Sequence, residues 1–201
     1  MTKVICIAHQ KGGVGKSTLA LNLYNGFQNT LKVCLIDADP QGSLVGLKSI
    51  LEELNIEQFQ KNIDKHKVDN DLIIIDTPPY LSAQLPELFI SSDFVLIPTK
   101  AGFFDLMAAK STIAMFSNAL KIKTTIKAGI VFNMVRHNSS ISKELRDLIL
   151  NDNVPILNSI ISERVSYTRS LISGGIFNST DEKAKTEIVN LADEILINLG
   201  I

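Results

Sequence analysis

A glycine-rich segment between an apolar run and a helical segment constrains the fold of this chain more than any other feature. It follows the apolar run at residues 4–8, leads into a predicted helix over residues 19–27, and reads Gln10-Lys11-Gly12-Gly13-Val14-Gly15-Lys16-Ser17-Thr18. Glycines let a backbone curl so that successive N–H groups point at one phosphate chain, and a helix N-terminus adds its positive dipole end. The pattern predicts a phosphate-binding loop in which Lys16 faces the outer phosphates and the Ser17 hydroxyl ligates Mg²⁺.

The rest of the fold is predicted by apolar runs that alternate with helical patterns. The runs span residues 4–8, 33–36, 72–75, 94–97 and 126–132, with a weaker one at 154–157. They are apolar at every position, as strands covered on both faces require. Between and after them, apolar residues recur three and four apart at 106–120 and 188–199. This order predicts an α/β fold with a doubly wound, mostly parallel sheet and helices on both faces, in a single domain over residues 1–201.

Composition excludes several classes of protein. Hydrophobic residues make up 45% and charged residues 20% of the chain, which is typical of a globular protein. No apolar run approaches the roughly 18 residues of a membrane span, and the N-terminal run is too short for a signal peptide, so we expect a cytoplasmic protein. Cys6 and Cys34 lie inside apolar runs and form no Cys-x-x-Cys motif, so we expect two buried, inert thiols.

Three aspartates follow two of the predicted strands. Asp37 and Asp39 come after the run at 33–36, and Asp76 comes directly after the run at 72–75. The carboxyl ends of parallel strands meet at the ligand-binding edge of such a sheet, so we expect these side chains beside the phosphate loop. Asp76 is the expected carboxylate for Mg²⁺. Ordinary turn formation is the alternative reading of these aspartates.

The segment KGGVGKST, residues 11–18, resembles the ParA/MinD family of deviant Walker ATPases, and most closely the short plasmid-type ParA partition ATPases. A strict Walker pattern would have glycine where Gln10 stands, and the additional lysine, Lys11, is the mark of this family. The resemblance implies a slow, Mg²⁺-dependent and partner-stimulated ATP hydrolase that dimerises on ATP, with Lys11 reaching the nucleotide of the other subunit. It implies that Asp39 orients the attacking water and that Asp37 supports the metal shell. The predicted catalytic residues are Lys11, Lys16 and Asp39, and the predicted metal residues are Ser17, Asp37 and Asp76.

Asn133 and Met134 are the candidates for binding the base. The guanine-reading motif Asn-Lys-x-Asp does not occur, and the run at 126–132 leads instead into Asn133-Met134. An amide can pair with adenine while a methionine packs on its ring, as in similar family members, although Asn at a strand end is also a common turn former. The predicted ATP site therefore comprises Gly12, Gly13, Val14, Gly15, Lys16, Ser17, Thr18, Asn133 and Met134.

Charge is distributed unevenly along the chain. Residues 121–170 carry eight basic and four acidic side chains, a net charge of +4, whereas residues 39–93 carry ten acids and four lysines, a net charge of -6. This asymmetry suits a dimer that presents a basic face to DNA without reading bases, and an ordinary solvated surface is the alternative. Arg164 and Arg169 are the first candidates for DNA contact. The family resemblance implies non-specific DNA binding on the nucleoid, a centromere-binding ParB-like partner, and a role in plasmid or chromosome partition.

Two other functions stay open at this stage. A MinD-like membrane-positioning ATPase would end in a basic amphipathic helix lying on anionic lipid. The segment 187–196 is acidic on its polar side, so no membrane binding is expected. A nucleotide-dependent dimeric scaffold would differ from the partition ATPase only in having little turnover.

Overall fold

The computed structural model describes residues 1–49, 51, 54–60, 62–80, 83–136, 143–150 and 154–201. Seven strands form one sheet in the order β3-β2-β4-β1-β5-β6-β7, and each neighbouring pair is parallel. The strands are β1 (Lys3–Ile7), β2 (Val33–Asp37), β3 (Ile56–Gln58), β4 (Leu72–Asp76), β5 (Phe94–Thr99), β6 (Lys127–Val135) and β7 (Ile156–Ser162). The predicted α/β fold with a parallel sheet is confirmed.

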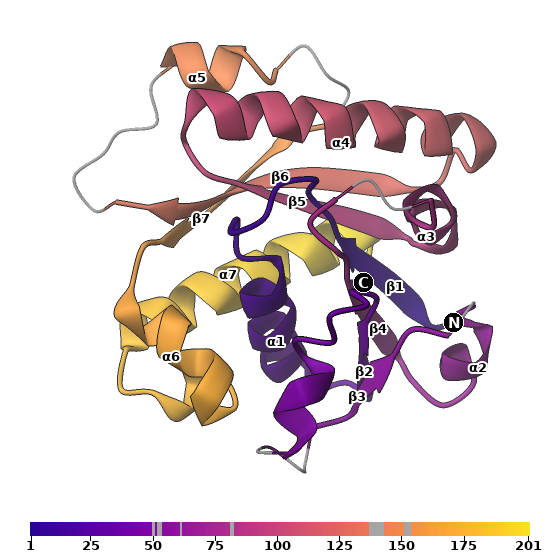
Figure 1. Cartoon of the computed structure of the whole chain (residues 1–201), viewed down its shortest axis with the longest axis vertical. Coiled ribbons are helices and arrows are strands. Elements are labelled where there is room, and N and C mark those ends of the chain that lie inside the picture. The colour runs from indigo at the N-terminus through magenta and orange to yellow at the C-terminus, as the bar shows by residue number, and fades with distance from the viewer. Residues whose placement is uncertain (50, 52–53, 61, 81–82, 137–142, 151–153) are drawn as a thin grey trace.

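Helices cover both faces of the sheet (Figure 1). One layer holds α3 (Leu85–Ser91), α4 (Phe103–Ile122) and α5 (Lys143–Asp147), and the other holds α1 (Lys16–Phe27), α6 (Val165–Ser173) and α7 (Glu182–Leu199). The short α2 (Asp64–Lys67) and two 3₁₀ turns, η1 (Val45–Ser49) and η2 (Ile176–Asn178), complete the described elements. No helix in these described stretches combines the length and apolarity needed to cross a membrane.

Burial on both faces explains why the strands read as unbroken apolar runs. In β1, Ile5 and Ile7 pack into the core with α1 and α7, while Val4 and Cys6 pack into the core with α3 and α4. The side chains of a strand alternate between faces, so every position of a doubly covered strand must be apolar.

Three strands differ from the sequence prediction. The β6 strand runs over Lys127–Val135 rather than 126–132, so Asn133 and Met134 lie inside it and not after its end. The β3 strand was not predicted, because it has three residues, Ile-Glu-Gln, at the edge of the sheet and therefore carries no apolar run. The last strand, β7, runs over Ile156–Ser162 rather than 154–157, and only part of its length is buried. Edge strands have one free side, so their residue pattern is less hydrophobic than that of central strands.

Strand register gathers the polar ends of three strands at one edge of the sheet. Asp76 of β4 lies opposite Ile7 of β1 on one side and opposite Asp37 of β2 on the other. The glycine-rich loop follows β1 directly and enters α1. The predicted loop and the predicted carboxylates therefore meet at the carboxyl edge, as expected for an open α/β sheet.

Candidate functional site

The loop between β1 and α1 adopts a conformation that depends on glycine. Gly13 and Gly15 have φ values of 71° and 88°, in the left-handed region that side chains disfavour. A Cβ atom on Gly15 would also lie only 2.3 Å from Nδ2 of Asn133. Gly15 is the N-cap of α1, so the loop delivers its backbone directly to the N-terminus of that helix.

The loop bounds an open cavity of about 310 Å³ that is suited to a phosphate chain. Lys16 is buried at its wall, and its Nζ donates to the carbonyl oxygen of Lys11 at 3.4 Å. Burial lowers the pKa of Lys16, while the charges of Asp76 and Asp39 act to raise it. An anion in the cavity would stabilise this buried ammonium. The lining residues are Gly12, Gly13, Gly15, Lys16, Ser17, Thr18, Asp39, Ser43, Thr77, Pro79 and Leu171.

Asp76 is a buried carboxylate at the end of β4. Burial raises the pKa of Asp76 to about 7, and the charges of Asp37 and Asp39 add to the effect, whereas a hydrogen bond from Ser17 and the charge of Lys16 oppose it. Its Oδ1 has no hydrogen-bond partner among the described residues. Hard oxygen ligands of this kind suit Mg²⁺, so Asp76 and the Ser17 hydroxyl fit the predicted ion.

Asp37 organises the loop that follows β2. Its Oδ1 accepts the backbone N–H of Asp39 at 3.0 Å, and its Oδ2 accepts the N–H groups of Leu44 and Val45 at 2.8 and 3.1 Å. The carboxylate is completely buried, so these three bonds supply its stabilisation. Both oxygens thus accept backbone hydrogen bonds, which agrees with the supporting role that the resemblance implies for Asp37.

Asp39 is held at the cavity wall by its own loop and by the edge strand. Its Oδ1 accepts the backbone N–H of Gln41 at 3.0 Å. Gln58 of β3 donates through Nε2 to the carbonyl oxygens of Asp37 and Asp39, at 2.9 and 3.3 Å. Sequence reasoning missed Gln58, because the strand that carries it gave no signal.

The signature lysine is held by contacts within its own subunit. Lys11 Nζ forms an ion pair with Oδ1 of Asp105 at 2.7 Å, and the two side chains are 44% and 14% exposed. The backbone N–H of Lys11 donates to Nδ1 of His9 at 3.0 Å. Burial, with a smaller effect of the Lys16 charge, lowers the pKa of His9 to about 4, so the ring is neutral and can accept this bond.

Sequence reasoning gave no role to His9 and did not single out Asp105. Asp105 lies in the first turn of α4, where the helix dipole stabilises a carboxylate. It is 94 positions from Lys11 in the chain, so only the folded structure brings the two together. His9 carried a weak signal, since it directly precedes the loop.

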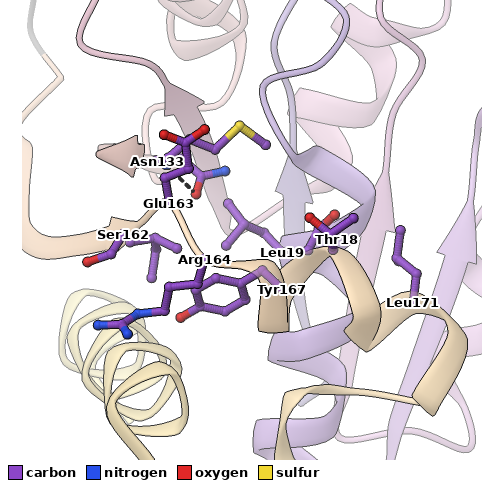
Figure 2. A pocket seen from close by; sticks show the side chains of 11 residues that line it. Thr18, Leu19, Asn133, Ser162, Glu163, Arg164, Tyr167 and Leu171 are labelled. Atoms are coloured by element: carbon purple, nitrogen blue, oxygen red, sulfur yellow. Dashed lines mark hydrogen bonds between the residues drawn. The ribbon is translucent and has the colours of Figure 1, made fainter. Parts of the chain in front are cut away.

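A second cavity of about 300 Å³ adjoins the first and suits a planar ring (Figure 2). The two cavities share Thr18 and Leu171. Figure 2 shows Asn133 next to Glu163 on one side of the pocket, with Leu19 and Thr18 to the right of them. The lining residues are Thr18, Leu19, Asn133, Met134, Ile161, Ser162, Glu163, Arg164, Tyr167, Thr168 and Leu171.

The predicted base-binding pair is placed at this second cavity, but Asn133 is already engaged. Its Nδ2 donates to the carbonyl oxygen of Val14 at 2.7 Å, and its Oδ1 accepts the backbone N–H of Met134 at 2.9 Å. Met134 has a φ of 55°, an uncommon value for a residue other than glycine. In this structure Asn133 therefore braces the phosphate loop, and its contact with adenine stays a prediction.

The two arginines predicted to contact DNA differ in their surroundings. Arg164 pairs with Glu187 at 3.1 Å and with Asp181 at 3.6 Å, and its side chain is 21% exposed. Its positive charge is therefore largely neutralised by acidic side chains of the same subunit. Arg169 lies on the exposed side of α6, and no partner of its guanidinium is found in the parts of the chain that the structure describes.

Known proteins are similar to this chain in sequence and in fold. The model of the CobQ/CobB/MinD/ParA nucleotide binding domain matches residues 5–176. Maintenance of carboxysome distribution protein A of Halothiobacillus neapolitanus is 29% identical, over 96% of this chain and 95% of its own length. The solved structure of apo McdA from Cyanothece is similar with a TM-score of 0.78 at 18% identity, covering 97% of this chain and 100% of that chain. A Borrelia burgdorferi plasmid partition protein bound to AMPPNP gives a TM-score of 0.73 at 22% identity, covering 98% of this chain and 99% of that chain.

Proposed function

The chain belongs to the CobQ/CobB/MinD/ParA nucleotide-binding family, and from this we propose that it is a ParA-type ATPase that positions cargo by cycles of ATP-dependent dimerisation. In this proposal the ATP-bound dimer associates with DNA non-specifically, and hydrolysis releases it. The first cavity takes the triphosphate and the second takes adenine. Their shared wall at Thr18 and Leu171 supports one ligand that spans both.

Binding of the triphosphate relies on groups that this chain leaves incompletely satisfied. Lys16 exchanges its 3.4 Å hydrogen bond to the Lys11 carbonyl for bonds to phosphate oxygens. These charge-assisted bonds stabilise the buried ammonium group. Ser17 and Asp76 would hold Mg²⁺ at the loop. The ion would supply positive charge that offsets the negative charge of the phosphates during hydrolysis.

Hydrolysis is proposed to depend on Asp39, which would orient the attacking water. Asp37 and Gln58 fix the backbone of Asp39 from two sides, so little reorganisation is needed when ATP arrives. Asp39→Ala is expected to retain ATP binding and to lose turnover. Undiminished steady-state hydrolysis in this variant would remove Asp39 from the mechanism.

Dimerisation is proposed to bring Lys11 to the nucleotide of the other subunit. A cation supplied in trans to a phosphoryl group can increase the rate by several orders of magnitude, roughly 10³–10⁵-fold in related phosphoryl transfers. The observation that carries this proposal is the half-exposed Lys11 side chain, which pairs with Asp105 and does not line the phosphate cavity of its own subunit. In this proposal, formation of the dimer is favoured by the contact of Lys11 with the γ-phosphate, so it occurs only when a γ-phosphate is present.

DNA binding is proposed for the exposed basic side chains of the ATP-bound dimer, with Arg169 as the first candidate. Such binding is expected to weaken steeply with salt, because contact with phosphates releases counterions. A small DNA-binding adaptor of ParB type is the proposed stimulating partner. The similarity to a carboxysome distribution protein leaves open whether the cargo is a plasmid, a chromosome or another large assembly.

The C-terminal helix gives a reason to prefer DNA over a membrane as the surface. Two glutamates of α7 accept hydrogen bonds from backbone N–H groups of the edge strand β7: Glu194 accepts from Ser159 at 2.8 Å and Glu187 accepts from Ser162 at 3.0 Å. The apolar residues of α7, including Ile188 and Leu191, are buried against the sheet. Neither side of this helix is thus arranged for anionic lipid.

The experiment that tests the proposal is sizing of the protein with ADP and with a slowly hydrolysed ATP analogue, with and without DNA. We expect a monomer with ADP, a dimer with the analogue, and DNA retention by the dimer alone. Equal DNA retention in both nucleotide states would contradict the switch. Liposome sedimentation with ATP tests the membrane alternative, and single-turnover hydrolysis with and without partner separates the ATPase from a scaffold with little turnover.

A further inference from the structure

Three side chains that commonly ligate metals meet at the edge of the sheet formed by β2 and β3. Cys34 comes from β2, Glu57 from β3 and His66 from α2. Cys34 Sγ is 4.0 Å from Oε1 of Glu57, and His66 Nδ1 is 3.4 Å from Oε2 of the same carboxylate. One ligand atom from each of the three lies within 4.8 Å of the other two.

The burial of this cluster suits an ion that enters from one side. Cys34 is completely buried, and the side chain of His66 is 4% exposed. Glu57 is 42% exposed, so solvent reaches the cluster through the carboxylate. His66 Nε2 is buried and has no hydrogen-bond partner among the described residues. The nitrogen that faces Glu57 is Nδ1, and this is the atom through which His66 would bind an ion in the cluster.

We propose that Cys34, Glu57 and His66 bind one transition-metal ion of the Zn²⁺ class. A tetrahedral Zn²⁺ with ordinary bond lengths to sulfur, nitrogen and oxygen separates neighbouring ligand atoms by roughly 3.4–3.6 Å. The His66–Glu57 separation of 3.4 Å matches this geometry. The Cys34–Glu57 separation of 4.0 Å, measured to the other carboxylate oxygen, and the Cys34–His66 separation, which is within 4.8 Å, have to shorten when the ion binds. A soft sulfur and an imidazole favour Zn²⁺ or Co²⁺ over Mg²⁺, and three protein ligands leave one position for water.

Binding of the ion displaces the proton of the thiol. Burial raises the pKa of Cys34 to about 12, with a further contribution from the charge of Glu57, so the thiol is protonated without an ion. The ion binds the thiolate, and the proton passes to solvent. This exchange gives Cys34 a role that its apolar sequence context did not predict.

The site would fasten the weakest strand of the sheet. The β3 strand pairs over three residues and lies at the sheet edge, and Glu57 lies opposite Ile36 of β2. The next residue, Gln58, holds the carbonyl oxygens of Asp37 and Asp39. A bound ion would therefore tie together β2, β3 and α2, and would restrain the loop that carries Asp39.

The test is a Co²⁺ titration of chelator-treated, nucleotide-free protein, followed by ultraviolet absorption. Thiolate ligation gives a sulfur-to-cobalt charge-transfer band, which Co²⁺ bound only by oxygen at the Mg²⁺ site cannot give. We expect one ion per chain, loss of the band in Cys34→Ser, and displacement of Co²⁺ by Zn²⁺. Cys6→Ser is the matched control, because Cys6 is also a buried strand thiol and should keep the band.

Absence of the band in the folded wild-type protein would overturn the proposal, as would an undiminished band in Cys34→Ser. If Cys34→Ser does not fold, Glu57→Gln decides, because this side chain is partly exposed and its replacement leaves the core intact. We expect Glu57→Gln to bind Co²⁺ about tenfold more weakly or worse. Unchanged affinity in that variant would also overturn the proposal. None of these readouts depends on ATP binding or hydrolysis.

Discussion

Replacement of Asp105 by asparagine should strengthen ATP-dependent dimerisation. In the structure, Asp105 holds the Lys11 ammonium at 2.7 Å within its own subunit. If Lys11 is to reach the nucleotide of another subunit, as proposed, this ion pair must break first. Asp105→Asn removes the charge that holds Lys11 and keeps the shape of the side chain.

The size of the effect follows from the exposure of the pair. Side chains that are 44% and 14% exposed are screened by water, so the pair is worth about 0.2–1 kcal/mol. A symmetric dimer breaks two such pairs, which gives about 0.4–2 kcal/mol. The dimer dissociation constant should therefore fall by roughly 2- to 30-fold, and the gain should shrink as salt is added.

Sedimentation velocity with a slowly hydrolysed ATP analogue measures this constant directly. Asp64→Asn is the matched control, because Asp64 pairs with Lys67 at 3.0 Å on α2 and belongs to neither nucleotide cavity. An unchanged or weaker dimer in Asp105→Asn, relative to this control, would refute the reasoning. It would mean that Asp105 and Lys11 remain together in the dimer.

Two further predictions concern stability and DNA. Asp76→Asn should raise the free energy of unfolding of the nucleotide-free protein. In the wild-type protein the folded-state pKa of Asp76 is about 7, so the folded state loses stability relative to the unfolded state as the pH rises above about 4. Chemical denaturation across pH should show a gain of at most about 4 kcal/mol above pH 7 that vanishes near pH 3, and a gain independent of pH would contradict this origin. Arg164→Ala should lower the free energy of unfolding by about 1–3 kcal/mol, because it removes the charged partner of Glu187. Arg169→Ala should leave the free energy of unfolding unchanged and weaken DNA retention. Full DNA retention by Arg169→Ala at moderate salt would exclude that side chain from the interface.

The central part of the fold was predictable because each of its residues obeys a local rule. The strands β1, β2, β4 and β5 are covered on both faces, so their apolar runs identify them directly. The loop from Lys11 to Thr18 needs glycine at fixed positions for its backbone, and this requirement is visible in the sequence. The all-parallel order of the sheet then followed from alternation of strands and helices.

The parts that were not predictable depend on contacts between distant residues. Asp105 reaches Lys11, and Glu57 reaches Cys34 and His66, only because the sheet brings their elements together. The positive charge of the segment at 121–170 is less available for DNA than the number of basic residues suggests. Arg164 is paired with Glu187 of α7 and with Asp181, the N-cap of that helix. A charge count reports the number of side chains and not their partners.

The brace between Asn133 and the Val14 carbonyl has a practical consequence for studies of nucleotide preference. One side chain serves both the ring pocket and the glycine turn, and Gly15 packs directly against it. Substitutions of Asn133 chosen to admit a different purine would also remove its support of the phosphate loop. A general drop in nucleotide affinity would then be mistaken for altered selectivity. A swap at Thr168, an exposed residue that lines the same pocket, offers a cleaner way to retune it.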